Sequence, residues 1–178
     1  MNLPNWITLS RLLALPILLY CLASPTVETR IFSTIVFLVA AATDWLDGYL
    51  ARKLDQVTQL GKFLDPLVDK LLVLTPLLAL IQLGQVPAWG VFLILARELS
   101  IAGWRVTPGL TGSTAVVGAN IWGKVKTISQ IIAIALLIAP LPEIGVTVAQ
   151  ISFWIAVAIT LISGLIYVMP QSGKQKEA

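Results

Sequence analysis

Histidine is absent from the 178-residue chain, and cysteine occurs only once, as Cys21. Without an imidazole group the protein cannot use a Ser-His-Asp triad, histidine-bound zinc or a phosphohistidine intermediate. A lone cysteine excludes an internal disulfide framework and a cysteine-rich zinc site. Any catalysis by this chain must therefore depend on carboxylates, lysines, arginines, hydroxyl groups or bound metal ions.

Charged residues are also scarce. They make up 12% of the chain, hydrophobic residues make up 57%, and the mean hydropathy is +0.89. A soluble domain typically has about 25% charged and about 45–50% apolar residues. The composition therefore excludes an ordinary soluble globule. It also excludes a disordered chain, which would be far more polar.

The chain has long hydrophobic runs instead. A membrane-spanning helix needs about 20 largely apolar residues, and six stretches qualify. Proline, glycine and short polar runs separate them, and no connection is long enough to fold by itself. We expect an all-α integral membrane protein with a single domain over residues 1–178. The predicted spans are 7–23, 31–51, 62–83, 87–105, 122–139 and 146–169.

The basic residues predict how these spans are oriented, because cytoplasmic loops carry an excess of lysine and arginine. With both termini in the cytoplasm, Arg30 is the one basic residue of the 12 that falls on the opposite side. The reverse orientation would place all the others outside. We therefore expect a multi-pass protein of the cell (inner) membrane, with both termini and the active site on the cytoplasmic side.

Two stripes of acidic and small residues flank the polar segment 53–59. Near the end of the second span, four positions share one helix face because they are spaced i, i+3, i+4 and i+7. They are Asp44, Asp47, Gly48 and Ala51. In the third span, Gly61, Asp65 and Asp69 recur every four residues. The short polar turn makes the two helices antiparallel neighbours, so we expect the stripes to face each other near the membrane surface.

Four carboxylates in a poorly hydrated cleft repel one another unless cations or protons lie between them. Hard divalent cations that prefer oxygen ligands, Mg²⁺ or Mn²⁺, suit such a site. Two such ions can clamp a phosphoryl group for in-line transfer. The alternative is that the aspartates form structural salt bridges with the neighbouring basic residues Arg52, Lys53, Lys62 and Lys70. The register of four aspartates on two stripes favours the metal site.

The segment from Asp44 to Asp69 reads Asp-x2-Asp-Gly-x2-Ala-Arg-x8-Gly-x3-Asp-x3-Asp without a gap or a substitution. It resembles the signature of the CDP-alcohol phosphatidyltransferase family. The resemblance implies six transmembrane helices around a polar cavity open to the cytoplasm, and a homodimer. It also implies a reaction in which an alcohol attacks a CDP-linked phosphoryl group and releases CMP.

The same resemblance implies roles for the residues of the signature. Two Mg²⁺ or Mn²⁺ ions would be held by Asp44, Asp47, Asp65 and Asp69. Asp69 would also accept the proton of the attacking hydroxyl group, since a carboxylate base beside the nucleophile suits this chemistry. The CDP-diacylglycerol site would include Asp47, Gly48, Ala51, Arg52 and Gly61, with Arg52 paired to a phosphate.

The N-terminal segment Leu3–Arg11 resembles the Pro-Asn-x2-Thr-x2-Arg opening of bacterial members of the family. It places Asn5, Thr8 and Arg11 at three-residue spacing on a helix, and the resemblance adds Asn5 and Thr8 to the CDP-diacylglycerol site. The alternative is an interfacial anchor. In that case Trp6 would lie in the headgroup region, and Arg11 would extend to the membrane surface.

Two further motifs bear on the alcohol that accepts the phosphatidyl group. They are Ala96-Arg97-Glu98 and the segment Gly-Lys-Val-Lys-Thr at 123–127. Together they resemble the branch of the family whose acceptor is sn-glycerol 3-phosphate. A cationic pocket for the acceptor's phosphate would consist of Arg97, Arg105, Lys124 and Lys126. Taken singly, each of these residues could instead follow the positive-inside bias or meet anionic lipid.

These resemblances imply CDP-diacylglycerol and glycerol 3-phosphate as substrates, membrane lipid as the surroundings and no nucleic-acid partner. The nearest alternative is a relative with another acceptor, such as phosphatidylglycerol or a phosphorylated inositol. A cation transporter is the alternative outside this class, but its ion site would lie near the bilayer midplane rather than at helix ends. The resemblance is weak across 106–119 and beyond 138, so no functional residue is taken from those regions.

Overall fold

A computed structural model describes residues 3–53, 59–106 and 121–168. Within these ranges, the side chains of residues 3–5, 44–53, 59–60, 62–63, 105–106 and 168 lie outside the described part. The described residues form six helices and no strand, which confirms the predicted all-α class for them. The helices are α1 (Leu3–Ala23), α2 (Val27–Lys53), α3 (Gln59–Gln82), α4 (Ala88–Val106), α5 (Ile121–Ile138) and α6 (Glu143–Val168).

Each predicted span corresponds to one helix, but α2 begins before its hydrophobic run because its first turn is capped. The Thr29 amide donates to Thr26 Oγ1 at 3.2 Å, and the Thr26 amide donates to Thr29 Oγ1 at 2.8 Å. This exchange satisfies two amides at the helix start, where intrahelical acceptors are missing. Hydropathy predicts a start near residue 31, because the polar capping residues lower the mean hydropathy of the first turn.

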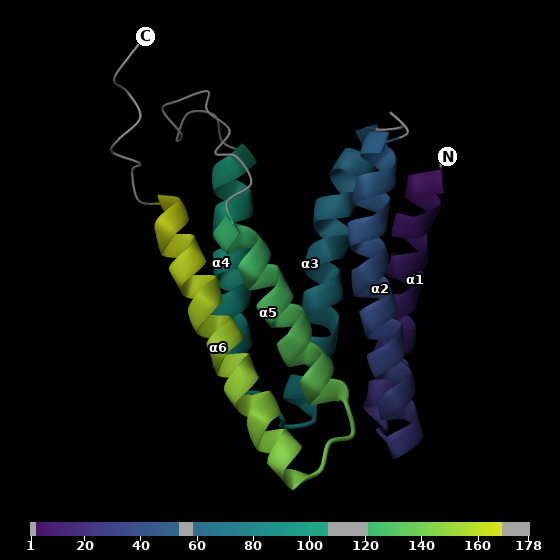
Figure 1. Ribbon diagram of the computed structural model, residues 1–178, viewed down its shortest axis with the longest axis vertical. Helices are drawn as coiled ribbons and strands as arrows, with labels where there is room; N and C mark the ends of the chain where they lie inside the picture. The colour runs from purple at the N-terminus through teal and green to yellow at the C-terminus, as the bar shows by residue number, and fades with distance from the viewer. Residues whose placement is uncertain (1–2, 54–58, 107–120, 169–178) are drawn as a thin grey trace.

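The helices form two groups of three, α1–α3 and α4–α6 (Figure 1). α1 packs against both α2 and α3, and α6 packs against α4 and α5. α5 also contacts α2 and α3 and thereby joins the two groups. α2 and α3 run antiparallel, as predicted from the short turn, but each contacts α1 more extensively than it contacts the other.

The up-and-down path of the chain gathers alternate helix ends. The starts of α1, α3 and α5 lie at one end of the assembly together with the ends of α2, α4 and α6, at the top of Figure 1. The opposite end holds the three short connections, α1–α2, α3–α4 and α5–α6. The motifs at 3–11, 96–98 and 123–127, and the described parts 44–53 and 59–69 of the acidic signature, therefore belong to the same end of the molecule.

The apolar core lies toward the end with the short connections. Phe37, Leu80, Ile138 and Phe153 are fully buried, and each lies in the half of its helix nearer that end. Buried polar side chains at the other end include Thr8, Arg11, Lys126 and Ser163. Apolar packing thus holds one end of the molecule together, and the buried charged side chains Arg11 and Lys126 lie at the end with the sequence motifs.

Three helices are long and apolar enough to cross a membrane, within the part of the chain that the structure describes. These candidate spans are Trp6–Ala23 in α1, Ile121–Ile138 in α5 and Glu143–Tyr167 in α6. Their outward faces carry exposed large apolar side chains such as Leu13, Ile132 and Ile155. Apolar surface of this extent suits lipid rather than water. The crossing of the other three helices stays a prediction.

Candidate functional site

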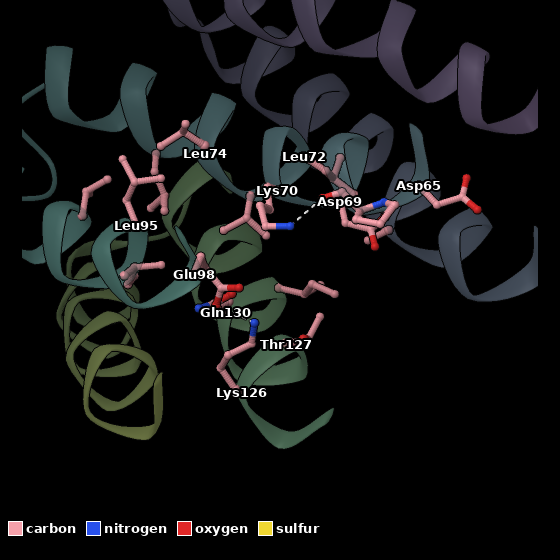
Figure 2. A pocket seen from close by; sticks show the side chains of 17 residues that line it. Asp65, Asp69, Lys70, Leu72, Leu74, Leu95, Glu98, Lys126, Thr127 and Gln130 are labelled. Atoms are coloured by element: carbon pink, nitrogen blue, oxygen red, sulfur yellow. Dashed lines mark hydrogen bonds and ion pairs between the residues drawn. The ribbon is translucent and has the colours of Figure 1, made fainter. Parts of the chain in front are cut away.

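A cavity of about 350 Å³ lies between the two groups of helices. Its walls come from α3, α4 and α5, with Ala41 contributed by α2. The volume falls in the range typical of small-molecule sites, about 300–1,000 Å³. The polar side chains that line it (Figure 2) are Asp65, Asp69, Lys70, Glu98, Lys126, Thr127 and Gln130. Two predicted metal ligands and one predicted acceptor-binding lysine therefore surround one space.

α3 contributes the acidic wall of the cavity. Asp65 and Asp69 lie one helical turn apart, so both project from the same face. The Lys70 ammonium donates to the Pro66 carbonyl of its own helix at 2.8 Å, the dashed line in Figure 2. Lys70 is thereby held by the backbone, whereas a structural salt bridge would have paired it with one of the aspartates.

α1 supplies a partner for each aspartate. Thr8 Oγ1 donates to Asp65 Oδ1 at 3.0 Å, and Arg11 Nη1 donates to Asp69 Oδ1 at 3.4 Å. Thr8 and Arg11 are three residues apart, which matches the one-turn spacing of the aspartates on the neighbouring helix. Arg11 is 2% exposed, whereas the Asp69 side chain is 47% exposed. Arg11 therefore holds Asp69 from the buried side and leaves it accessible from the cavity.

The buried position of Arg11 bears on the two interpretations of the N-terminal segment. An interfacial anchor would extend the guanidinium to the membrane surface, yet Arg11 points into the bundle toward α3. Trp6 is exposed, as an anchor requires, so only that residue fits the alternative. The sequence prediction gave Arg11 no role in the site. Its three-residue spacing from Thr8 is the signal that could have assigned one.

The basic wall of the cavity is formed by Lys126 of α5, and a carboxylate from α4 holds it in place. Lys126 Nζ donates to Glu98 Oε1 at 2.5 Å, and Arg97 Nη1 donates to the same oxygen at 3.3 Å. Lys126 is buried, and a buried ammonium group is costly unless it has an anionic partner. Glu98 meets that need, although sequence reasoning placed it in a motif without giving it a function.

Arg97 extends away from the cavity toward α6. Its Nη2 donates to Ser163 Oγ at 2.8 Å, and its side chain does not line the cavity. Lys124 is exposed and does not line the cavity either. Of the predicted acceptor-binding residues, Lys126 therefore lies at the cavity wall, and Arg97 is linked to it through Glu98.

Several predicted site residues have side chains outside the described part of the chain. They are Asn5, Asp44, Asp47, Gly48, Ala51, Arg52 and Arg105. Gly61 is described and is buried in the first turn of α3. The shared face of Asp65 and Asp69 is confirmed by the cavity they line, and the facing stripe on α2 stays a prediction.

The carboxylates of the acidic wall can be compared with the ligands that a metal ion needs. Among the described side chains, no three histidine, cysteine, aspartate or glutamate residues gather at one place. Asp65 and Asp69 nevertheless provide two carboxylates at the cavity wall, the ligand type that Mg²⁺ and Mn²⁺ prefer. These two residues fit a hard divalent cation, and Asp44 and Asp47 would complete its ligands.

Comparison with known proteins gives matches along almost the whole chain. Residues 1–162 match the sequence profile of the CDP-alcohol phosphatidyltransferase family. The chain is 41% identical over 181 residues to the Bacillus subtilis protein named CDP-diacylglycerol–glycerol-3-phosphate 3-phosphatidyltransferase, with 93% of each chain covered. A Pseudomonas fluorescens protein of that name is 37% identical over 172 residues, covering 92% of this chain and 83% of that one. A Haemophilus influenzae protein of that name is 31% identical over 175 residues, covering 97% and 94%.

Proposed function

The chain belongs to the CDP-alcohol phosphatidyltransferase family, and we infer that it transfers the phosphatidyl group of CDP-diacylglycerol to sn-glycerol 3-phosphate. The products are phosphatidylglycerol phosphate and CMP, in phospholipid biosynthesis. The names of its relatives support both substrates. The structural observation that carries the inference is a single cavity with Asp69 on one wall and Lys126 on another.

The protein is a membrane protein by its family and its long apolar helices. We propose that all six helices cross the cell (inner) membrane as a single domain over residues 1–178. The cavity and both termini would face the cytoplasm. The gathering of the basic residues, except Arg30, on one side supports this orientation. A homodimer is proposed from family resemblance.

In this proposal Lys126 binds the acceptor and Asp69 activates it. Lys126 binds the phosphate of glycerol 3-phosphate by a charge-assisted hydrogen bond. That phosphate is remote from the attacking hydroxyl group, so the acceptor extends across the cavity from the basic wall to the acidic one. Asp69 accepts the hydroxyl proton as the oxygen attacks the phosphorus that carries the diacylglycerol. The bond from this phosphorus to CMP breaks, and CMP leaves.

We propose that two Mg²⁺ or Mn²⁺ ions are held by Asp44, Asp47, Asp65 and Asp69. When bound, they neutralise the negative charge of the pyrophosphate and of the transition state. The accessible carboxylates of Asp65 and Asp69 support this proposal. The remaining residues proposed for the CDP-diacylglycerol site are Asn5, Thr8, Gly48, Ala51, Arg52 and Gly61.

Thr8 and Arg11 keep the acidic wall in place in this proposal. Thr8 donates to Asp65, and Arg11 donates to Asp69. Both are buried, so they hold the carboxylates without occupying the cavity. Preorganised groups of this kind lower the cost of reaching the transition state, because they need no rearrangement during the reaction.

The test is CMP release by the purified protein with CDP-diacylglycerol, a divalent cation and one acceptor at a time. We expect release with glycerol 3-phosphate and much less with phosphatidylglycerol, a phosphorylated inositol or serine. Faster release with another acceptor would overturn the acceptor assignment and keep the family chemistry. Metal-dependent ion flux in vesicles without any CMP release would overturn the transferase itself in favour of a cation transporter.

A further inference from the structure

The Arg97 side chain is held between α4 and α6 by two residues of α6. Its Nη2 donates to Ser163 Oγ at 2.8 Å. A Cβ atom added to Gly164 would lie 2.9 Å from Arg97 Cγ and 3.5 Å from its Nε. The arginine stem therefore passes over the backbone at Gly164 with no room for a side chain, and its guanidinium ends on the neighbouring serine.

Ser163 is oriented to accept this hydrogen bond. Its hydroxyl donates to the Thr160 carbonyl at 3.1 Å within α6, so the hydroxyl proton is used and a lone pair faces Arg97. Ser163 is buried, and its removal would leave the Nη2 proton without this acceptor next to a buried position. The serine hydroxyl therefore fixes the direction of the guanidinium.

The fixed guanidinium of Arg97 is connected to the cavity through one oxygen atom of Glu98. Arg97 Nη1 and Lys126 Nζ both donate to Glu98 Oε1, at 3.3 Å and 2.5 Å. Arg97 does not line the cavity, whereas Glu98 and Lys126 do (Figure 2). The position of Arg97 therefore helps to set where the Glu98 carboxylate lies, and the carboxylate sets where the Lys126 ammonium lies.

We propose that Ser163 and Gly164 of α6 are positioning residues for the acceptor's phosphate. These two residues hold the Arg97 side chain. Arg97 and Lys126 both donate to the same Glu98 oxygen, and Lys126 binds the phosphate at the cavity wall. The proposal rests on the function proposed above. It adds α6 to the acceptor site, although α6 contributes no residue to the cavity lining.

Two substitutions test the proposal from different directions. Gly164→Ala introduces the crowding Cβ and shifts the arginine stem, and Ser163→Ala removes the acceptor of Nη2. Each is expected to raise the KM for glycerol 3-phosphate by about threefold to tenfold, less than the loss of a direct hydrogen bond to charge. The KM for CDP-diacylglycerol is expected to stay the same, because that substrate binds on the aspartate side.

Matched controls separate positioning from general damage to the helix packing. Gly90→Ala crowds the same α4–α6 interface equally, because its Cβ would lie 2.9 Å from Phe153 Cε1, but at the opposite end. Ser152→Ala removes a serine whose hydroxyl donates to the Ala149 carbonyl at 2.7 Å, as Ser163 does to Thr160, without an arginine partner. Both controls should leave both KM values unchanged.

A double substitution tests whether α6 acts through the arginine. In an Arg97→Ala background, Ser163→Ala should cause no further rise in the KM for glycerol 3-phosphate. Unchanged kinetics in folded Ser163→Ala and Gly164→Ala proteins would overturn the proposal, as would equal losses for both substrates or additive effects with Arg97→Ala. If the wild-type protein releases no CMP with glycerol 3-phosphate, the proposed function fails instead, and the two failures are thereby distinguished.

Discussion

Among the side chains that the structure describes, one buried cation of the α1–α3 group faces two carboxylates, whereas in the α4–α6 group one carboxylate faces two cations. Arg11 and Thr8 support the aspartates of α3 from inside the bundle. Glu98 accepts from both Arg97 and Lys126 on the other side of the cavity. Lys70 also lines the cavity on α3, where its ammonium donates to the Pro66 carbonyl. Together with Arg11 it balances the two aspartates, whereas Arg97 and Lys126 leave one net positive charge beside Glu98. The two walls therefore differ in how their charges are paired.

The two walls also differ in how open their charges are to a ligand. The Asp69 side chain is half exposed, while Lys126 is buried and bonded to Glu98. An incoming cation or proton can reach the acidic wall directly. An incoming phosphate must share Lys126 with a carboxylate that is already there. The acceptor side should thus be the weaker binding side, with affinity sensitive to small changes in geometry.

Removal of divalent cations should have the largest effect, because it acts on the acidic wall alone. We expect excess chelator to abolish CMP release and added Mg²⁺ or Mn²⁺ to restore it, because the proposed metal ions separate the carboxylates from the negative charge of the pyrophosphate. The measurement is CMP release before and after addition of each ion. Full turnover in excess chelator would contradict the metal proposal.

Asp69→Asn should produce the next largest effect. Loss of a general base typically lowers the rate by about 10²–10⁴-fold, and proton removal matters mainly in the transition state. Turnover should therefore fall much more than CDP-diacylglycerol binding, measured directly on the variant. Asp65→Asn is the comparison, because loss of a metal ligand should weaken binding and turnover together. The same pattern in Asp69→Asn would refute its role as the base.

Lys126→Ala tests the basic wall. A hydrogen bond to a charged group contributes about 1.5–3 kcal/mol, which corresponds to roughly tenfold to a hundredfold in affinity. The KM for glycerol 3-phosphate should rise by that factor, with little change in the KM for CDP-diacylglycerol. Lys124→Ala should have a smaller effect, since Lys124 is exposed and lies outside the cavity lining. Equal effects of the two substitutions would remove the distinction between the lysines.

Thr8→Val should give the smallest of these effects. It removes the donor to Asp65 Oδ1 and keeps the shape of the side chain. A neutral donor of this kind is worth about 1 kcal/mol, or roughly fivefold in the KM for CDP-diacylglycerol. Thr34→Val is the matched control, because Thr34 Oγ1 donates to the Arg30 carbonyl within α2. A loss of the same size in both variants would show that Thr8 supports its helix rather than the site.

Hydropathy, together with the proline, glycine and polar residues between the apolar runs, predicted the six helices. They missed the start of α2, where the Thr26 and Thr29 hydroxyls replace the hydrophobic signal. They correctly predicted α2 and α3 as antiparallel neighbours but did not predict the more extensive packing of each against α1. Pairing of distant helices depends on the fit of their surfaces, which one-dimensional hydropathy does not contain.

The signature predicted Asp65 and Asp69 at the cavity because residues four apart on one helix share a face. It could not predict Arg11 as the partner of Asp69, since 58 residues separate them and only packing brings them together. Glu98 was visible in its motif, but its role depends on two cations from different helices. Ser163 and Gly164 lie in an apolar run where no motif marks them, so only the path of Arg97 identifies them.

The turn at Gly84 connects the helices that carry the acidic wall and Glu98. Gly84 has a φ of 67°, a conformation that favours glycine, and its amide donates to the Ile81 carbonyl while that of Gln85 donates to Leu80. The side-chain amide of Gln150 in α6 also donates to the Gln85 carbonyl. This end of the α3–α4 hairpin is thereby anchored.

Because the hairpin is anchored at the turn, a change in the angle between its helices would displace their far ends most. At about 1.5 Å of rise per residue, Asp69 lies roughly 20 Å along α3 from Gln82, so a tilt of about 5° between α3 and α4 moves it by roughly 2 Å. A shift of that size separates a carboxylate within hydrogen-bond reach of a hydroxyl group from one beyond it. A small change of the angle between α3 and α4 at the turn would therefore change the position of Asp69, the proposed base, by a distance that matters for a hydrogen bond.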